Sequence, residues 1–198
     1  MRLAVLLSGR GSNFLAIQQA IADRKLDAQI VRVISNRPGA EGLRRANELG
    51  IPAHLIDHRQ YPTRAAHEEE VLRVLAEAEP DFICLAGYMR RLSPAFVAAY
   101  PQRILNIHPS LLPAFPGVDA QAQALAYGVK VSGCTVHFVD ENLDAGPIIV
   151  QRTVPVHNDD TAETLADRIL EQEHIAYAEA LIALSTTKWR IEGRRVIF

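Results

Sequence analysis

Short apolar runs alternate with stretches of helical spacing along the first half of the chain. In those stretches apolar side chains recur every three or four residues, and Phe14, Ile17 and Ile21 share one such helical face. This alternation predicts βαβ units, a largely parallel sheet and helices that cover the sheet on both faces. The expected strands are Leu3–Leu7, Gln29–Ile34, His54–Ile56, Phe82–Ala86 and Ile104–Ile107.

The pattern changes after residue 130. Two apolar runs, Val131–Val139 and Pro147–Val156, flank a polar turn and predict an antiparallel strand pair near the C-terminus. A long final helix follows, for which Asp160 and Glu163 have the spacing of a capping box. Because no linker or repeat interrupts the chain, residues 1–198 are expected to form a single α/β domain with a Rossmann-like, mostly parallel sheet.

Composition narrows the classes of partner. The chain has 198 residues with 21 basic and 23 acidic side chains, which gives no indication of a nucleic-acid partner. No run approaches the roughly 20 apolar residues of a membrane helix. The apolar start of the chain ends at Ser8 and Gly9, before a secretory signal could form, so we expect a cytoplasmic protein.

The two cysteines give no indication of a metal site. Cys84 and Cys134 lie in apolar stretches and lack the CxxC or Cys/His spacing of metal ligands. We therefore expect buried, reduced thiols and no metal.

The first turn, Ser8–Asn13, follows a predicted strand and precedes a predicted helix. Its small residues would let backbone amides approach an anion at the helix N-terminus, as in phosphate-binding loops. A dinucleotide fingerprint starting at Gly9 would need glycine at position 14, where Phe14 stands, and no Walker lysine follows. A single phosphate remains as the expected ligand, and the alternative is an ordinary turn in which Ser12 or Asn13 caps the helix.

Three polar residues follow or end apolar runs in the second half of the chain. Asn106 and His108 end the run that starts at Arg103, and Asp144 lies in the turn between the last two predicted strands. An amide that donates a hydrogen bond, an imidazole that moves a proton and a carboxylate that keeps the imidazole charged together suit a reaction that forms an oxyanion. In the alternative, His108 caps a strand and Asp144 belongs to a solvated turn.

Four ordered motifs give the chain a family resemblance. Their combination closely resembles the phosphoribosylglycinamide formyltransferases of purine synthesis, from about residue 1 to residue 180. The motifs are Ser8–Asn13, Ala86–Pro94, Asn106–Pro113 with Phe115–Gly117, and Asp144–Pro147.

The resemblance implies transfer of a formyl group from 10-formyltetrahydrofolate to the amine of glycinamide ribonucleotide, without a metal. It also implies the catalytic role of Asn106, His108 and Asp144. The implied nucleotide-binding residues are Gly11, Ser12 and Asn13 at the phosphate and Glu173 at the ribose. The implied folate-binding residues are Arg64, Met89, Arg90, Arg91, Leu92 and Asn106.

Three of the implied binding residues, and the acidic run near Arg64, have a simpler reading. Glu173 would be an exposed helical carboxylate, Arg64 and Arg90 would be surface cations, and Glu68–Glu70 is expected to be a solvated face.

Two other activities remain as alternatives. The first is hydrolysis of formyltetrahydrofolate. The resemblance to the hydrolases that catalyse it is weaker, because their pattern has a second His where this chain has Pro109. The second is a folate-binding or nucleotide-binding module without catalysis, which would be expected to lose Asn106, His108 or Asp144. The expected partners are small molecules, and the sequence leaves open a monomer or a homodimer.

Overall fold

The computed structural model describes residues 1–198 and contains two compact units, Met1–Leu105 and Asn106–Phe198. The division falls inside strand β5 (Ile104–His108), so this strand contributes its start to the first unit and its end to the second. That the whole chain is one domain stays a prediction.

The first unit contains a parallel sheet with the strand order β3-β2-β1-β4. Strand β1 pairs with β2 on one side, with Val5 opposite Val33, and with β4 on the other, with Val5 opposite Cys84. The strands are β1 (Arg2–Leu7), β2 (Gln29–Ser35), β3 (Ala53–Leu55) and β4 (Phe82–Leu85). All four predicted strands of this unit are therefore confirmed to within one residue at each end.

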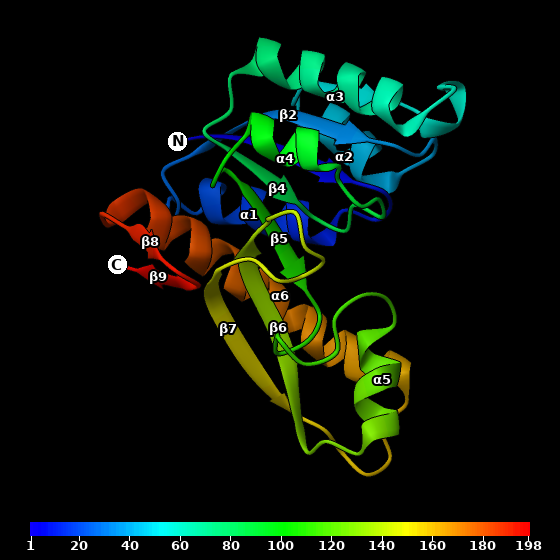
Figure 1. The fold of residues 1–198 in the computed structure, drawn as a ribbon, viewed down its shortest axis with the longest axis vertical. Coiled ribbons are helices and arrows are strands. Elements are labelled where there is room, and N and C mark those ends of the chain that lie inside the picture. The colour runs from blue at the N-terminus through cyan, green and yellow to red at the C-terminus, as the bar shows by residue number, and fades with distance from the viewer. The chain divides into compact units, whose positions relative to one another are not determined.

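The direction of the chain across this sheet places the helices. It moves outward from β1 to β2 and β3 and then crosses back to β4, and because such crossovers are right-handed, the reversal changes the face that the connecting helix covers. Figure 1 shows α1 and α3 on opposite sides of the strands of this unit. The helical segments are α1 (Ser12–Ala22), α2 (Glu41–Glu48), η1 (His58–Gln60), α3 (Arg64–Ala78) and α4 (Pro94–Ala99).

Burial follows from this coverage. Leu3 to Leu7 are all fully buried, as expected for a central parallel strand with both faces covered. On α1, Phe14 and Ile17 are buried and Ile21 is half-buried, which confirms the predicted apolar face. The core of the first unit thus lies on both faces of β1.

The second unit contains the antiparallel pair β6 (Val131–Phe138) and β7 (Ile148–Pro155), with Val131 opposite Pro155. The pairing has an irregularity between Val136 and His137. Two short strands, β8 (Arg190–Glu192) and β9 (Arg195–Ile197), extend this part of the sheet in the order β6-β7-β9-β8. The predicted α/β class, with a mostly parallel sheet and a C-terminal antiparallel pair, is confirmed.

Helix α6 (Ala162–Thr186) packs along β6 and β7 and also contacts α5 (Ala120–Tyr127). Its buried side chains recur with helical spacing, among them Leu165, Ile169 and Tyr177. No helix of the chain has both the length and the apolar character that a membrane-crossing segment requires.

The N-terminal cap of α6 differs from the prediction. The capping box is formed by Thr161 and Thr164, each of which accepts a hydrogen bond from the other's backbone N–H, at 3.2 and 3.0 Å. Asp160 instead pairs with Arg168 at 2.7 Å and accepts from His157 N. The prediction that Asp160 and Glu163 form the box was thus wrong by one residue, because the Arg168 guanidinium binds the carboxylate of Asp160.

Candidate active site

Asn106 and His108 are positioned by the end of β5. Alternate side chains of a strand point to the same face, so these two residues share a face while Ile107 points to the other. His108 is 4% exposed and Asn106 is half-buried. Both lie within the strand, not in a loop beyond it, so their relative positions are fixed by the strand backbone.

Asp144 approaches this pair from the loop between β6 and β7. Its Oδ2 atom lies 3.5 Å from His108 Nδ1 and accepts a hydrogen bond of 2.8 Å from the backbone N–H of Gly117. The side chain is 11% exposed, which contradicts the alternative of a solvated turn. Gly146 is needed in this loop, because a Cβ there would lie 1.8 Å from the carbonyl oxygen of Phe138.

Both ring nitrogens of His108 lie near oxygen atoms. Nε2 is 2.8 Å from the carbonyl oxygen of Phe115, and since a carbonyl can only accept, Nε2 carries a proton. The 3.5 Å between Nδ1 and Asp144 exceeds an ordinary N–H···O hydrogen bond. Nδ1 is therefore the ring nitrogen that retains capacity for a further partner beside the carboxylate.

His137, near the end of β6, is a fourth member of the cluster and is not among the predicted site residues. It is 2% exposed, its Nδ1 donates to the Phe138 carbonyl at 2.8 Å, and its Nε2 lies 4.0 Å from Asp144 Oδ1. Burial lowers the pKa of His137 from its ordinary value, against the smaller opposing effects of the Phe138 carbonyl and Asp144. We therefore assign a neutral ring with its proton on Nδ1 and a free acceptor at Nε2.

That acceptor orients the amide of Asn106. Asn106 Nδ2 lies 3.2 Å from His137 Nε2, so one of the two amide N–H groups is directed at the imidazole. The second N–H remains available as a donor on the same face as His108. Asn106, His108, His137 and Asp144, called the catalytic cluster below, thus form one connected set within the second unit.

The phosphate candidate lies at the start of α1 in the first unit. Gly11 is the N-cap with a left-handed backbone (φ +76°), and a Cβ there would lie 2.8 Å from Gly42 Cα. Ser12 and Asn13 are the first helical residues and neither caps the helix, so the alternative of a side-chain cap is wrong. The amides of a helix's first turn have no carbonyl partner within the helix, which suits an anion at this position.

Ser8 joins this turn to the predicted folate-binding stretch. Its Oγ donates to Asn36 Oδ1 at 2.5 Å and accepts from Met89 N at 2.8 Å, while its own N–H donates to the Gly87 carbonyl at 3.0 Å. The residue therefore ties together the carboxyl ends of β1, β2 and β4. These strand ends flank the point where the strand order reverses, the usual ligand position in open α/β sheets.

The predicted folate residues extend from β4 towards α4. Met89 is 65% exposed, Arg90 is half-buried, Arg91 is exposed and Leu92 is buried. Burial raises the pKa of neighbouring Tyr88 to about 12, so its hydroxyl stays protonated and can donate.

Arg64, the other predicted folate residue, begins α3 and pairs with Glu68. Arg64 Nε lies 3.0 Å from Glu68 Oε1, and the same oxygen accepts from Ser93 N at 3.0 Å. Glu68 is only 6% exposed, so the expectation that it belongs to a solvated face was wrong. Its carboxylate fixes both Arg64 and the chain that follows the folate stretch, and the Arg64 side chain itself stays 43% exposed.

Glu173 lies on the buried face of α6. It is 8% exposed, so the alternative of an exposed helical carboxylate is wrong. Burial, and next the negative charge of Glu173, raise the pKa of Cys134 to about 12. Cys84 and Cys134 are both free and buried, as predicted.

Over residues 1–181, which include parts of both units, the chain matches the formyl transferase family. Phosphoribosylglycinamide formyltransferase of Bacillus subtilis (strain 168) is 42% identical over 180 residues, which cover 91% of this chain and 92% of that protein. The crystal structure of glycinamide ribonucleotide transformylase 1 from Symbiobacterium toebii matches with a TM-score of 0.96 and 48% identity, covering 99% of this chain and 92% of that one.

A third relative is much longer. Trifunctional purine biosynthetic protein adenosine-3 of Gallus gallus is 50% identical over 181 residues, which are 91% of this chain and 18% of that protein. The chain therefore spans only a small part of the trifunctional relatives that it matches.

The assigned state of His137 predicts how stability depends on pH. The pKa of His137 in the folded chain is lower than its ordinary value of 6.5. As the pH falls through 6.5, His137 therefore binds a proton in the unfolded chain before it does so in the folded chain, and the free energy of unfolding decreases. Each such proton contributes at most about 1.4 kcal/mol per pH unit. Urea unfolding at pH 7 and pH 5 should therefore show a smaller loss of stability on acidification for His137→Gln than for the wild type.

The matched control is His157→Gln, which removes an exposed histidine from the same unit and should keep the wild-type difference. Burial also lowers the pKa of His67 and His174, so the substitution of His137 should remove only part of the effect. An unchanged difference in His137→Gln would contradict the neutral assignment.

Proposed function

The chain belongs to the formyl transferase family, and from that premise we propose that it transfers a formyl group from 10-formyltetrahydrofolate to the amine of glycinamide ribonucleotide. The observation that carries this proposal is the catalytic cluster, in which an amide donor, an imidazole and a carboxylate converge beside a second, neutral imidazole. The names of the relatives from Bacillus subtilis and Symbiobacterium toebii support the same substrate.

In the proposed reaction the neutral amine of the nucleotide attacks the formyl carbon. The C=O double bond becomes a single bond to a negatively charged oxygen, and the attacking nitrogen becomes positively charged and loses a proton. The carbon–nitrogen bond to the folate then breaks, the carbonyl re-forms and the folate nitrogen takes up a proton. The protein must therefore stabilise an oxyanion and move a proton at one place.

The catalytic cluster has groups for both tasks. The second N–H of Asn106 would donate to the oxyanion, because the first is directed at His137. His108 would add an N–H from Nδ1, the ring nitrogen beside Asp144 that lacks a short hydrogen bond. Asp144 would orient the imidazole so that Nδ1 faces the reacting atoms and can pass a proton to the departing folate nitrogen.

The binding residues are part of the same proposal. Gly11, Ser12 and Asn13 would hold the phosphate at the start of α1, and the buried carboxylate of Glu173 would accept from a ribose hydroxyl. On the folate side, the main chain of residues 89–92 would flank the pterin together with Asn106. Arg64 and Arg90 would meet the negatively charged glutamate tail.

We also propose that the protein acts in the cytoplasm, because its two free, buried thiols suit a reducing compartment. Its partners would be small molecules, and a monomer and a homodimer are both compatible with a cluster contained in one chain. That no metal takes part stays a prediction.

Hydrolysis of formyltetrahydrofolate is the alternative reaction, with water in place of the amine. The residue after His108 argues against hydrolysis. This chain has Pro109 at the position where the sequence pattern of the hydrolases has a second histidine. A binding module without catalysis is disfavoured because Asn106, His108 and Asp144 are all retained and lie in one cluster.

One assay separates these activities. We expect the absorbance change for consumption of 10-formyltetrahydrofolate to depend strictly on added glycinamide ribonucleotide, because the amine is the proposed nucleophile. Consumption with release of formate in the absence of the nucleotide would identify a hydrolase. No consumption under either condition would identify a binding module.

Substitutions in the catalytic cluster test the assigned groups. Asn106→Ala, His108→Ala and Asp144→Asn should each lower kcat by about 100-fold or more. Loss of one oxyanion donor typically costs roughly 3–4 kcal/mol, and Asp144→Asn removes the carboxylate beside the His108 donor. Circular dichroism should show that each variant folds. The matched control is Glu141→Gln, which removes a charge from the same loop at an exposed position and should keep nearly wild-type kcat. Near wild-type turnover in His108→Ala would contradict the proton-transfer role.

The phosphate assignment has its own test. Ser12→Asp places a carboxylate beside the proposed phosphate, and the repulsion should raise the nucleotide KM by about tenfold or more while the folate KM changes little. Ser12 is preferable to Gly11 for this purpose, because a side chain at Gly11 would meet the Gly42 backbone. Ser12→Ala serves as the control without charge, and an unchanged nucleotide KM in Ser12→Asp would exclude phosphate from this turn.

A further inference from the structure

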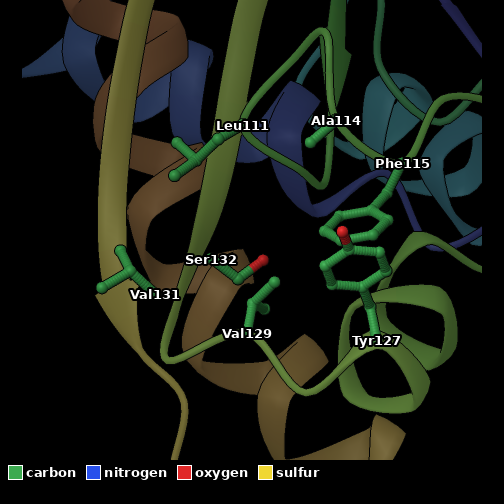
Figure 2. A pocket seen from close by; sticks show the side chains of 7 residues that line it. All are labelled: Leu111, Ala114, Phe115, Tyr127, Val129, Val131 and Ser132. Atoms are coloured by element: carbon green, nitrogen blue, oxygen red, sulfur yellow. The ribbon is translucent and has the colours of Figure 1, made fainter.

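A cavity of about 430 Å³ lies in the second unit, between the loop that follows β5, the end of α5 and the start of β6. Figure 2 shows the rings of Phe115 and Tyr127 on one side of this space and Leu111 and Val131 on the other. Ala114, Val129 and Ser132 complete the lining between them. Because Tyr127 is 80% exposed and Val131 is 52% exposed, the cavity opens to solvent along these two side chains. None of the residues described as catalytic or substrate-binding lines it.

The lining indicates which class of molecule would fit. Its surface is largely apolar and carries no charged side chain, and the rings of Phe115 and Tyr127 meet edge to face, with centroids 5.8 Å apart. A dry apolar cavity of about 150 Å³ already accommodates a benzene ring in another protein, so the volume here is sufficient for a substituted ring. Charged ligands are disfavoured, because nothing in the lining would replace their hydration.

One polar atom of the lining has no partner. The Ser132 side-chain hydroxyl is buried without a hydrogen bond, and the residue is only 3% exposed. In Figure 2 its oxygen points towards the side of the cavity formed by Phe115 and Tyr127. A buried hydroxyl without a partner carries a free-energy cost that a hydrogen-bonding ligand could relieve.

We propose that this cavity binds a small, neutral aromatic molecule with one hydrogen-bonding substituent, and that occupation of the cavity lowers turnover through Phe115. The ring of Phe115 forms the cavity wall, whereas its carbonyl oxygen accepts the 2.8 Å hydrogen bond from His108 Nε2. A ligand that pushes the ring aside therefore also moves the backbone group that orients the catalytic imidazole.

The local backbone supports this coupling. Phe115 has φ +53°, in the left-handed region that a bulky residue rarely adopts. The preceding residue is held by a 2.6 Å hydrogen bond from Ser110 Oγ to the Ala114 carbonyl. On the other side, the N–H of Gly117 donates to Asp144 at 2.8 Å. Because the chain is fixed on both sides and strained at Phe115, displacement of the ring is expected to rotate the Phe115 peptide away from its present position. The effect on turnover rests on the proposed function, whereas binding to the cavity does not.

Phenol is a suitable probe for binding. Titration of the ¹⁵N-labelled full chain should give saturable shifts of the amide signals of Val129, Val131 and Ser132, with a dissociation constant on the order of 1 mM for so small a ligand. Ala114→Leu should weaken binding at least fivefold, because Ala114 also lines the cavity and is exposed enough to accept a larger side chain. Tyr127→Ala, which removes an exposed wall, should weaken it as well.

Two outcomes of this titration would overturn the site. The first is the absence of saturable shifts at these three amides. The second is unchanged phenol affinity in both Ala114→Leu and Tyr127→Ala, which would mean that phenol binds elsewhere.

Toluene tests the polar part of the proposal, because it has the same ring without a hydroxyl. Phenol should bind the wild type more tightly than toluene, and in Ser132→Ala this preference should disappear. Equal affinities of the two probes for the wild type would overturn the assignment of a hydrogen-bonding substituent.

Turnover tests the coupling to His108. At saturating concentrations of both substrates, phenol well above its dissociation constant should lower kcat roughly twofold or more, and Ala114→Leu should remove this inhibition relative to its own rate without phenol. Binding by NMR without any change in kcat would overturn the coupling. A protein with no formyl transfer at all would instead contradict the proposed function, and the binding titration would still decide the cavity.

Discussion

The carboxylate of Asp144 is the group on which the geometry of the catalytic cluster depends. A charge withdrawn from water must find partners, and this side chain is 11% exposed. Its partners are the backbone N–H of Gly117 and the nearby rings of His108 and His137. The loop after β5 and the loop after β6 must therefore stay close to each other, and the 2.9 Å hydrogen bond from the Phe138 N–H to the Pro147 carbonyl closes the second of these loops.

This requirement gives the two imidazoles different chemistry. His137 is buried, its Nδ1 proton is bound by a carbonyl, and its lowered pKa keeps it neutral, so it can only orient Asn106. His108 has its Nε2 proton directed at a carbonyl and its Nδ1 beside a carboxylate. The neighbours of the two rings thus make His137 an orienting acceptor and place Nδ1 of His108 beside a carboxylate, as the proposed proton transfer requires.

The sequence predicts the strands well and the short helices poorly, for the same physical reason. A buried strand requires a run of apolar residues, and Leu3–Leu7 is such a run. Helix α2 buries only Gly42 and Ala46, and α5 buries only Ala120 and Ala124, so neither has an apolar stripe. Their presence depends on close packing of small residues, for which the sequence shows no apolar period.

Predictability within the candidate site also follows burial. Glu68 and Glu173 each fall on the buried stripe of a helix, with Val71 following Glu68 three residues later and Tyr177 following Glu173 four residues later. The helical period was thus a signal that these carboxylates are buried. His137 had no comparable signal, because a single imidazole in an apolar strand looks like a core residue until the neighbouring strand places Asn106 against it.

The proposed groups divide between the two units in a way that bears on kinetics. The phosphate turn and most folate residues belong to the first unit, where Ser8 connects them, whereas the catalytic cluster belongs to the second. Groups that contact parts of a substrate remote from the reacting carbon bind the ground state and the transition state alike, so their loss acts mainly on KM. Groups that meet the oxyanion act mainly on kcat. Glu173 shows whether the contact or the unit decides the kinetic effect, because it is a proposed binding residue in the second unit. Since it would touch only the ribose, its substitution should act mainly on KM, although the catalytic cluster lies in the same unit.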